Sequence, residues 1–178
     1  VQDPPLPRPQ DAAWCRAPVD CFIRSRLEAV GLAPTRQLSR SALLRRVSFD
    51  LNGLPPTLDE LKQFTHTADP DAFGRVVDRL LASPSYGERW GRHWLDVVRY
   101  CDSRDARHTG QAYDVNEAWR YRDWVVNAFN RDLAYDEFVR QQIAGDILPI
   151  SDSQEDAARG LVATGMLVIG EWGSGDAD

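Results

Sequence analysis

The stretch SPSYGERWGRHWLDVVRY, residues 83–100, decides the fold because it joins a helix start to a helical repeat of large side chains. Ser83-Pro84 places an N-cap before a proline at the first helical position, which favours a helix beginning there. Apolar and aromatic residues then recur every three or four positions, along one side of a helix: Tyr86, Trp90, Trp94 (or His93), Val97 and Cys101. We expect this side to form a core stripe against a neighbouring helix.

Other helices are indicated on both sides of this stretch by the same signals. Thr57 and Glu60 form a capping-box pattern, and Asp69-Pro70 repeats the arrangement of Ser83-Pro84. The expected helices run from Pro18 toward Gly31, from Ser39 or Ser41 to Leu51, from Thr57 to Phe64, from Asp69 to Leu81, from Asn116 to Phe129, from Asp136 to Ile143 and from Asp156 to Met166. No stretch alternates with period two for long enough to predict a strand. The sequence therefore predicts an all-α fold, a compact bundle of about seven short capped helices.

The N-terminal residues differ from the rest of the chain in composition. Prolines occupy positions 4, 5, 7 and 9, which favours an extended, polyproline-like conformation. We therefore expect an extended proline-rich arm, residues 1–16, and a single helical domain, residues 17–178. Within that domain, Cys101 to Val115 is predicted to be a long polar loop, and loops of this length are often functional.

Charge and hydropathy disfavour two kinds of environment. Acidic and basic residues are interleaved at a net charge of −6, without a basic stripe, so nucleic acid is not an expected partner. The longest apolar run, Leu161 to Ile169, is far shorter than the roughly 20 residues that cross a bilayer. We therefore do not expect the chain to span a membrane.

Tryptophan and arginine residues make up the candidate ligand-binding set. Tryptophan faces stack on sugar rings, and arginine forks pair with anions. The candidates for such a shallow pocket are Trp90, Trp94, Trp119, Arg120 and Arg122. The simpler interpretation, which we favour, is an aromatic core seam bordered by satisfied salt bridges, because large aromatic side chains usually dominate core energetics.

Titratable residues around residue 100 supply the only candidates for catalysis or metal binding. If the chain is an enzyme, the catalytic candidates are His93, Asp96, Arg99 and Asp102. The weak metal-ligand candidates are His93, Asp96, Asp102, Asp105 and His108. Their spacing is not diagnostic, so a hydrogen-bonded structural histidine is the favoured interpretation and no metal is expected. No nucleophile elbow and no glycine-rich phosphate loop occur in the sequence.

The three cysteines, Cys15, Cys21 and Cys101, form an odd set without a C-x-x-C or C-x-x-C-H motif. One disulfide with one remaining thiol fits an oxidising compartment, and three buried thiols fit the sequence equally. The pattern leaves both states open.

Five long phrases together resemble a known family: WCRAPVDCFIRSRLEAVGL, LLRRVSFDLNGLPPTLDEL, VVDRLLASPSYGERWGRHWLDVVRY, EAWRYRDWVVNAFN and FVRQQIAGDILP. The resemblance is to the planctomycete cytochrome-c-associated domain of unknown function, and it runs from about Trp14 to Leu167. It implies a large secreted or periplasmic bacterial protein, often one with cytochrome c modules beside this domain.

Two departures from the family pattern shape our expectations. Relatives continue past ATGMLVIG into a C-x-x-C-H motif that this chain does not reach, so we expect no cofactor here and haem c only in a partner or in downstream sequence. Cys21 and Cys101 stand where the family resemblance implies other residues, which makes a disulfide between them a hypothesis specific to this chain.

The leading functional hypothesis is a non-catalytic periplasmic or secreted helical accessory module. It would dock on a larger protein assembly, a cytochrome-c-containing or membrane redox complex, through the arm and the loop from Cys101 to Val115. The alternatives are the N-terminal part of a periplasmic carbohydrate-active or haem-dependent enzyme, and a carbohydrate-binding module.

Overall fold

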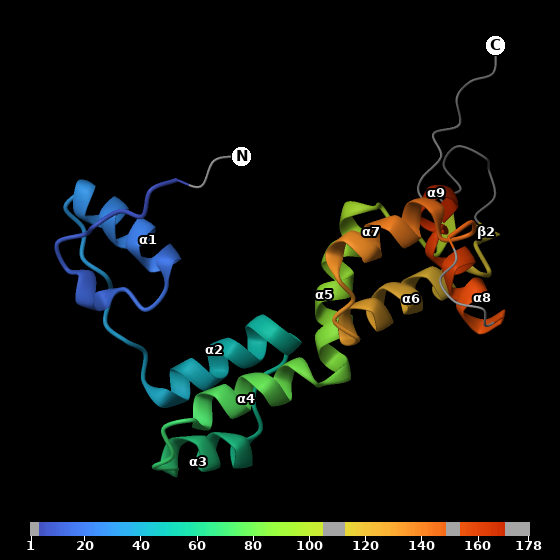
Figure 1. Cartoon of the computed structure of the whole chain (residues 1–178). Coiled ribbons are helices and arrows are strands. Elements are labelled where there is room, and N and C mark those ends of the chain that lie inside the picture. The colour runs from blue at the N-terminus through green and yellow to red at the C-terminus, as the bar shows by residue number, and fades with distance from the viewer. Residues whose placement is uncertain (1–3, 105–112, 149–153, 170–178) are drawn as a thin grey trace. The chain divides into compact units, whose positions relative to one another are not determined.

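The computed structural model describes residues 4–104, 113–148 and 154–169, and the chain separates into two compact units, Val1–Ser39 and Arg40–Asp178. Helices form nearly all of the regular structure in the described residues (Figure 1), so the predicted all-α class is confirmed. The first long helix, α1 (Pro18–Ala29), groups with the N-terminal residues. The structural division therefore falls after Ser39, whereas the sequence suggested a division after residue 16.

The N-terminal unit joins the proline-rich segment to one amphipathic helix. A short 3-10 helix, η1 (Ala12–Trp14), precedes α1. The Glu28 carboxylate of α1 accepts hydrogen bonds from the backbone amides of Gln10 at 2.9 Å and Asp11 at 3.2 Å. These backbone donors hold the pKa of Glu28 below its ordinary value. The predicted extended arm is thus tied back to the helix by the Glu28 carboxylate.

Both ends of α1 follow rules that the sequence displays. At the start, the Asp20 carboxylate accepts from the amides of Ala17 and Arg16, each at 2.9 Å, and these bonds lower the pKa of Asp20. At the end, Gly31 has a φ of 70°, and the Leu32 amide donates to the Leu27 carbonyl at 2.9 Å. Gly31 is therefore the predicted stop, in the left-handed conformation that ends many helices.

The second unit begins with three helices around a small core: α2 (Arg40–Asn52), α3 (Leu58–His66) and α4 (Ala72–Leu81). Leu44, Phe64 and Ala72 form its buried centre. The predicted capping box is confirmed, because the Glu60 amide donates to Thr57 Oγ1 at 3.2 Å and the Thr57 amide donates to Glu60 Oε2 at 2.7 Å.

The expected start of α4 at Asp69-Pro70 is wrong by two residues. The Asp69 carboxylate accepts from the Asp71 amide at 2.9 Å, which closes a turn around Pro70. The helix begins only afterwards, with Asp71 at the N-cap position and Ala72 as its first residue. Asp69 thus stabilises the turn that leads into the helix, and its side chain does not cap the helix itself.

The larger core of the second unit is built from the remaining helices: α5 (Pro84–Val97), α6 (Ala118–Asn130), α7 (Tyr135–Ala144), α8 (Gln154–Ala163) and α9 (Met166–Ile169). Helix α6 packs against α5 and α8, and α7 packs against α8 and α9 (Figure 1). The fully buried residues of this core are Ala118, Tyr121, Trp124, Val125, Ala128, Phe138 and Ala163. Five of them lie on α6, which makes α6 the central helix.

The stripe predicted for α5 is rotated relative to the face that the structure buries. Trp90 is 37% exposed and Val97 is 72% exposed, whereas Gly87 and Gly91 are buried. A Cβ built on Gly87 would overlap the Val126 carbonyl oxygen of α6. Two glycines one helical turn apart thus let the α5 backbone approach α6 closely, and bulky residues border this contact.

The long loop predicted between Cys101 and Val115 contains a minimal β-ladder. Strand β1 (Ser103–Arg104) pairs antiparallel with β2 (Tyr113–Asp114), and the Val115 amide donates to the Asp102 carbonyl at 2.8 Å. These bonds close the base of the loop next to the start of α6. Among the described helices, none combines the length and the apolar character needed to cross a bilayer.

Candidate functional site

The catalytic candidates on α5 lie on its exposed side. His93 and Asp96 are exposed, and the His93 ring meets the edge of the Trp90 ring at a centroid distance of 5.5 Å. Arg99 follows the helix with a φ of 55°, and the next amide, that of Tyr100, donates to the Leu95 carbonyl at 2.9 Å. The backbone of Arg99 therefore ends α5 in the left-handed conformation, and the three candidates do not line a common cavity among the described pockets.

Trp94 turns into the core and forms part of a buried hydrogen-bond network. Its indole N–H donates to Gln142 Oε1 at 2.9 Å and to the Tyr121 hydroxyl at 3.2 Å. The Tyr121 hydroxyl also donates to Gln142 Oε1 at 2.6 Å, and Gln142 Nε2 donates to the Phe138 carbonyl at 3.0 Å. Burial raises the pKa of Tyr121 to about 12. Three polar groups are thus satisfied inside an aromatic core.

Aromatic rings fill the rest of this core. Trp94 meets Phe138 edge-on at 4.9 Å, and Trp124 stacks on Phe138 at 5.3 Å and on Tyr121 at 6.1 Å. Such offset and edge-to-face pairs are the favoured arrangements of aromatic rings. These contacts favour the interpretation of Trp94 as part of a core seam, and Trp94 also lines a pocket of about 200 Å³ together with Tyr86 and Phe138.

Asp102 and Arg122 meet in a small charged group where the ends of α5 and α6 come together. The Tyr100 hydroxyl donates to the Asp102 carboxylate, and Arg122 Nη1 lies 3.9 Å from Asp102 Oδ2. Arg122 also pairs with Asp123 at 3.1 Å, a contact that raises the pKa of Arg122. Burial and the Asp102 carboxylate raise the pKa of Tyr100. The group holds the base of the long loop on α6.

No metal centre is formed by the described residues. Groups of three or more metal-ligating side chains do not occur within residues 4–104, 113–148 and 154–169. Asp105 and His108 lie outside the described residues, so the metal candidates that include them stay a prediction.

Cys15, Cys21 and Cys101 are all half-buried, and the structure draws no disulfide between them. Cys15 and Cys21 lie within hydrogen-bonding reach of each other in the N-terminal unit, and burial together with the Cys21 thiol raises the pKa of Cys15 to about 11. Cys101 belongs to the second unit. The disulfide expected between Cys21 and Cys101 would join the two units and stays a prediction.

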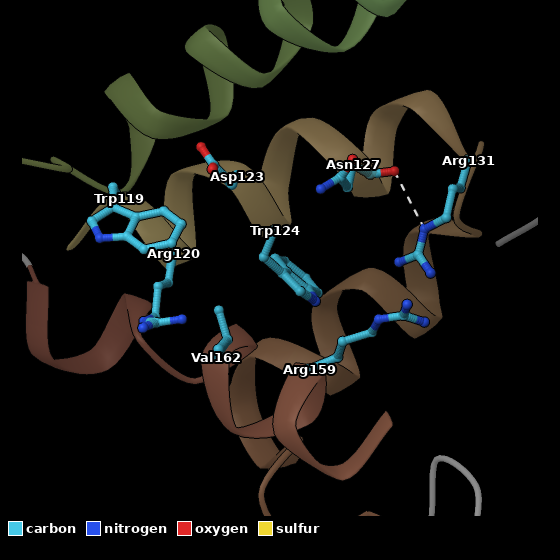
Figure 2. A pocket seen from close by; sticks show the side chains of 8 residues that line it. All are labelled: Trp119, Arg120, Asp123, Trp124, Asn127, Arg131, Arg159 and Val162. Carbon is cyan, nitrogen blue, oxygen red and sulfur yellow. Dashed lines mark hydrogen bonds between the residues drawn. The ribbon is translucent and has the colours of Figure 1, made fainter. Parts of the chain in front are cut away.

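A pocket of about 360 Å³ lies between α6 and α8 (Figure 2). Residues of both helices line it: Trp119, Arg120, Asp123, Trp124, Asn127, Arg131, Arg159 and Val162. Figure 2 shows the guanidinium ends of Arg131 and Arg159 on one side of the pocket, with Asp123 on the side nearer Trp119. The pocket is therefore apolar along its tryptophan wall and cationic at one end.

The charged residues of this α6–α8 pocket differ in their partners. Arg120 pairs with Glu117 and lies 4.7 Å above the Trp119 ring, and Asp123 pairs with Arg122. Arg131 donates through Nε to the Asn127 carbonyl at 3.4 Å, and no carboxylate of the described residues lies within ion-pair distance of it.

Trp124 contributes a buried donor to the same pocket. Its side chain is only 5% exposed, and its Nε1 lacks a hydrogen-bond acceptor among the described residues. Figure 2 shows the nitrogen-bearing edge of this indole directed toward the end of the pocket that holds Arg131 and Arg159. A buried indole N–H usually finds a partner, so this donor is unusual.

The structure brings only part of the predicted ligand set together. Trp119 and Arg120 line the α6–α8 pocket, whereas Trp90, Trp94 and Arg122 lie elsewhere. The pocket residues that the sequence analysis missed are Asp123, Trp124, Asn127, Arg131, Arg159 and Val162. Their signal was the recurrence of Arg120, Trp124, Asn127 and Arg131 at helical spacing, continued beyond the aromatic stretch.

Comparisons with known proteins give one clear result. No curated protein and no solved structure matches the chain. The family model that matches, over residues 18–177, is PSCyt2, described as a protein of unknown function (DUF1549). The match covers both the N-terminal helix and the entire second unit up to residue 177, so the chain belongs to the PSCyt2 family of proteins of unknown function.

Proposed function

We propose that this chain is a non-catalytic helical accessory module that docks on a larger protein assembly. The observation that carries the proposal is the apolar surface of α1. Val19, Phe22 and Ile23 are exposed, and none of the twelve residues of α1 is buried within the N-terminal unit. Contiguous exposed apolar side chains on a soluble domain often mark a protein contact.

The state of the predicted catalytic residues supports the same proposal. His93 and Asp96 lie on an exposed helix face, and Arg99 serves to end that helix. The aromatic residues around them fill a core whose polar atoms at Trp94 and Gln142 are satisfied. An active site would instead be expected to combine a cavity with convergent titratable groups.

The identity of the assembly rests on sequence resemblance. The PSCyt2-like phrases resemble a domain found beside cytochrome c modules in secreted or periplasmic proteins. We therefore propose a periplasmic or secreted location and a cytochrome-c-containing partner. The polypeptide needs no cofactor of its own for this role.

Affinity capture from the envelope fraction of the native host tests the proposal. Val19→Asp places a charge on the apolar face of α1, and Val97→Asp makes the same change at a similarly exposed position of α5. We expect a defined protein to be enriched with the wild-type and Val97→Asp chains but not with Val19→Asp. Haem staining of that protein then tests the cytochrome assignment.

If the wild-type chain enriches nothing beyond what Val19→Asp enriches, α1 is not a docking surface. If a protein is enriched but carries no haem, the accessory role survives and the cytochrome assignment is wrong.

A further inference from the structure

The α6–α8 pocket contains a cation, Arg131, that no carboxylate of the described residues balances. Arg131 uses Nε for the Asn127 carbonyl, and its terminal nitrogens have no carboxylate partner among the described residues. Arg159 adds a second guanidinium to the same end of the pocket. An anion bound at this end of the pocket would pair with the Arg131 guanidinium.

A second pocket contains two arginines whose partners can be compared with those of Arg131. In the pocket between α3 and α4, of about 280 Å³, Arg75 pairs with Asp69 and Arg79 pairs with Glu60 at 2.5 Å. Both arginines there have carboxylate partners supplied by the chain. Arg131 differs from these two pocket arginines, because no carboxylate of the described residues pairs with it.

The orphan donor of Trp124 points to the same ligand chemistry. Its buried N–H is directed toward the cationic end of the pocket, where an anionic oxygen would accept its hydrogen bond. At this end of the pocket the guanidinium groups and the indole N–H are all donors, so the part of the ligand that lies here must supply acceptors, whereas the Asp123 carboxylate lies at the side nearer Trp119. A carboxylate meets this requirement and matches the fork of an arginine.

The apolar wall of the pocket indicates which kind of group the rest of the ligand would carry. Trp119, Trp124 and Val162 present flat or aliphatic surface. The volume of about 360 Å³ is at the small end of the range for ligand pockets. Indole rings bind flat rings, whether aromatic or sugar, through their faces and edges.

We propose that the α6–α8 pocket binds a small carboxylic acid whose carboxylate is carried on a six-membered ring. The carboxylate lies between Arg131, Arg159 and the Trp124 N–H, and the ring lies along the wall formed by Trp119 and Val162. An aromatic acid and a sugar acid share this chemistry. The site is separate from α1 and does not depend on the docking role proposed above.

Isothermal titration calorimetry with four probes tests the site. Phenylacetate and D-glucuronate are the acids, and phenylacetamide and D-glucose are their uncharged counterparts. We expect at least one acid to bind about tenfold or more tightly than its counterpart, with the affinity falling as salt is added. The acid that binds more tightly identifies the ring as aromatic or sugar.

Variants assign the binding to this pocket. Arg131→Gln should weaken binding of the preferred acid about tenfold or more, and Arg131→Lys should weaken it less, because the charge remains while the fork is lost. Arg75→Gln, in the other pocket, is the matched control and should bind as the wild type does. Circular dichroism confirms that each variant is folded before titration.

Three results would overturn the proposal. The first is failure of both acids to bind at millimolar concentration, and the second is equal binding by Arg131→Gln and the wild type. The third is inorganic phosphate binding as tightly as either acid, which would remove the role of the ring. Because Val19→Asp should leave acid binding intact and Arg131→Gln should leave docking intact, failure of one proposal is distinguishable from failure of the other.

Discussion

Helices α1 and α6 are nearly equal in length, with 12 and 13 residues, but they use their apolar residues differently. Helix α6 buries five residues and is packed on two sides by α5 and α8. Within its own unit, helix α1 buries none of its residues and leaves Val19, Phe22 and Ile23 exposed. The comparison teaches that the same apolar content can build a core or a recognition surface, depending on whether the chain supplies a neighbour.

The difference begins with what packs against each helix. Gly87 and Gly91 of α5 bring its backbone close to α6, so that Val125 is fully buried. In the N-terminal unit, the segment that meets α1 is rich in proline and is held mainly by polar bonds to Glu28. Among its described residues, the N-terminal unit contains no second long helix against which α1 could bury its apolar residues.

The largest effect that should still leave the chain folded comes from filling the α5–α6 contact. A Cβ at Gly87 would overlap the Val126 carbonyl oxygen and lie 2.6 Å from Asn130 Cγ, and a backbone carbonyl cannot move aside cheaply. We expect Gly87→Ala to lower the free energy of unfolding by about 3 kcal/mol, measured by urea denaturation.

Gly74→Ala is the matched control for this change. Gly74 also lies within a helix, but a Cβ there meets no heavy atom within 4 Å. The control should stabilise the chain by up to about 1 kcal/mol, because alanine favours the helix. Equal effects of the two substitutions would contradict the close approach of α5 and α6.

The next effect concerns the buried phenol of α6 at high pH. Burial raises the pKa of Tyr121 from 10 to about 12, so the folded state favours the neutral phenol. Its contribution to stability is complete below pH 10 and is lost as the pH rises through about 12. The total loss is about 2.5 kcal/mol, and Tyr121→Phe should remove this part of the pH dependence.

Unfolding free energies of the two chains between pH 9 and 12 measure this difference. Tyr100→Phe is a necessary second variant, because burial and Asp102 also raise the pKa of Tyr100. A wild-type profile parallel to that of Tyr121→Phe would show that Tyr121 is not buried as described.

A somewhat smaller effect is expected at the glutamine of the core network. Gln142→Leu removes the acceptor of the Tyr121 hydroxyl and leaves a buried donor unsatisfied, which should cost about 2 kcal/mol in urea denaturation. Gln141→Leu changes the neighbouring glutamine, whose amide donates only to Glu137 at 2.8 Å, and should cost about half as much or less. The reverse order would mean that the network does not specify this core.

The helices of both units were predictable from the sequence, because the signals that start and end them act between residues close together in the chain. The Thr57 capping box, the glycine stop at Gly31 and the proline after Ser83 act within a few residues, so each could be recognised without a fold. The buried face of α5 could not, because its glycines matter only through their distance from α6. The spacing of aromatic residues predicted that Trp90 and Val97 face the core. The structure instead buries Gly87 and Gly91, because the α5 backbone approaches α6 closely there.

The α6–α8 pocket shows the same limit for function. Trp119 and Arg120 were recognisable as ligand candidates from residue type alone. Arg159 comes from a helix more than 25 residues away. That Arg131 has no carboxylate partner and Trp124 Nε1 no acceptor among the described residues is a property of the packed structure. The sequence shows which side chains can bind a ligand, but only the structure shows which of them lack a partner within the described residues.

The smallest expected effect is that of a charge on the exposed face of α1, and it directly tests the comparison between α1 and α6. Val19 of α1 is 65% exposed and Val125 of α6 is 0% exposed, so the same substitution probes a surface and a core. Val19→Asp should change the free energy of unfolding by less than about 0.5 kcal/mol, as surface substitutions usually do. Val125→Asp would bury an unpaired carboxylate and should prevent cooperative folding, seen as loss of the urea transition. If Val19→Asp proved strongly destabilising in the isolated chain, α1 would be covered by the chain itself, and its apolar face would belong to folding and not to recognition.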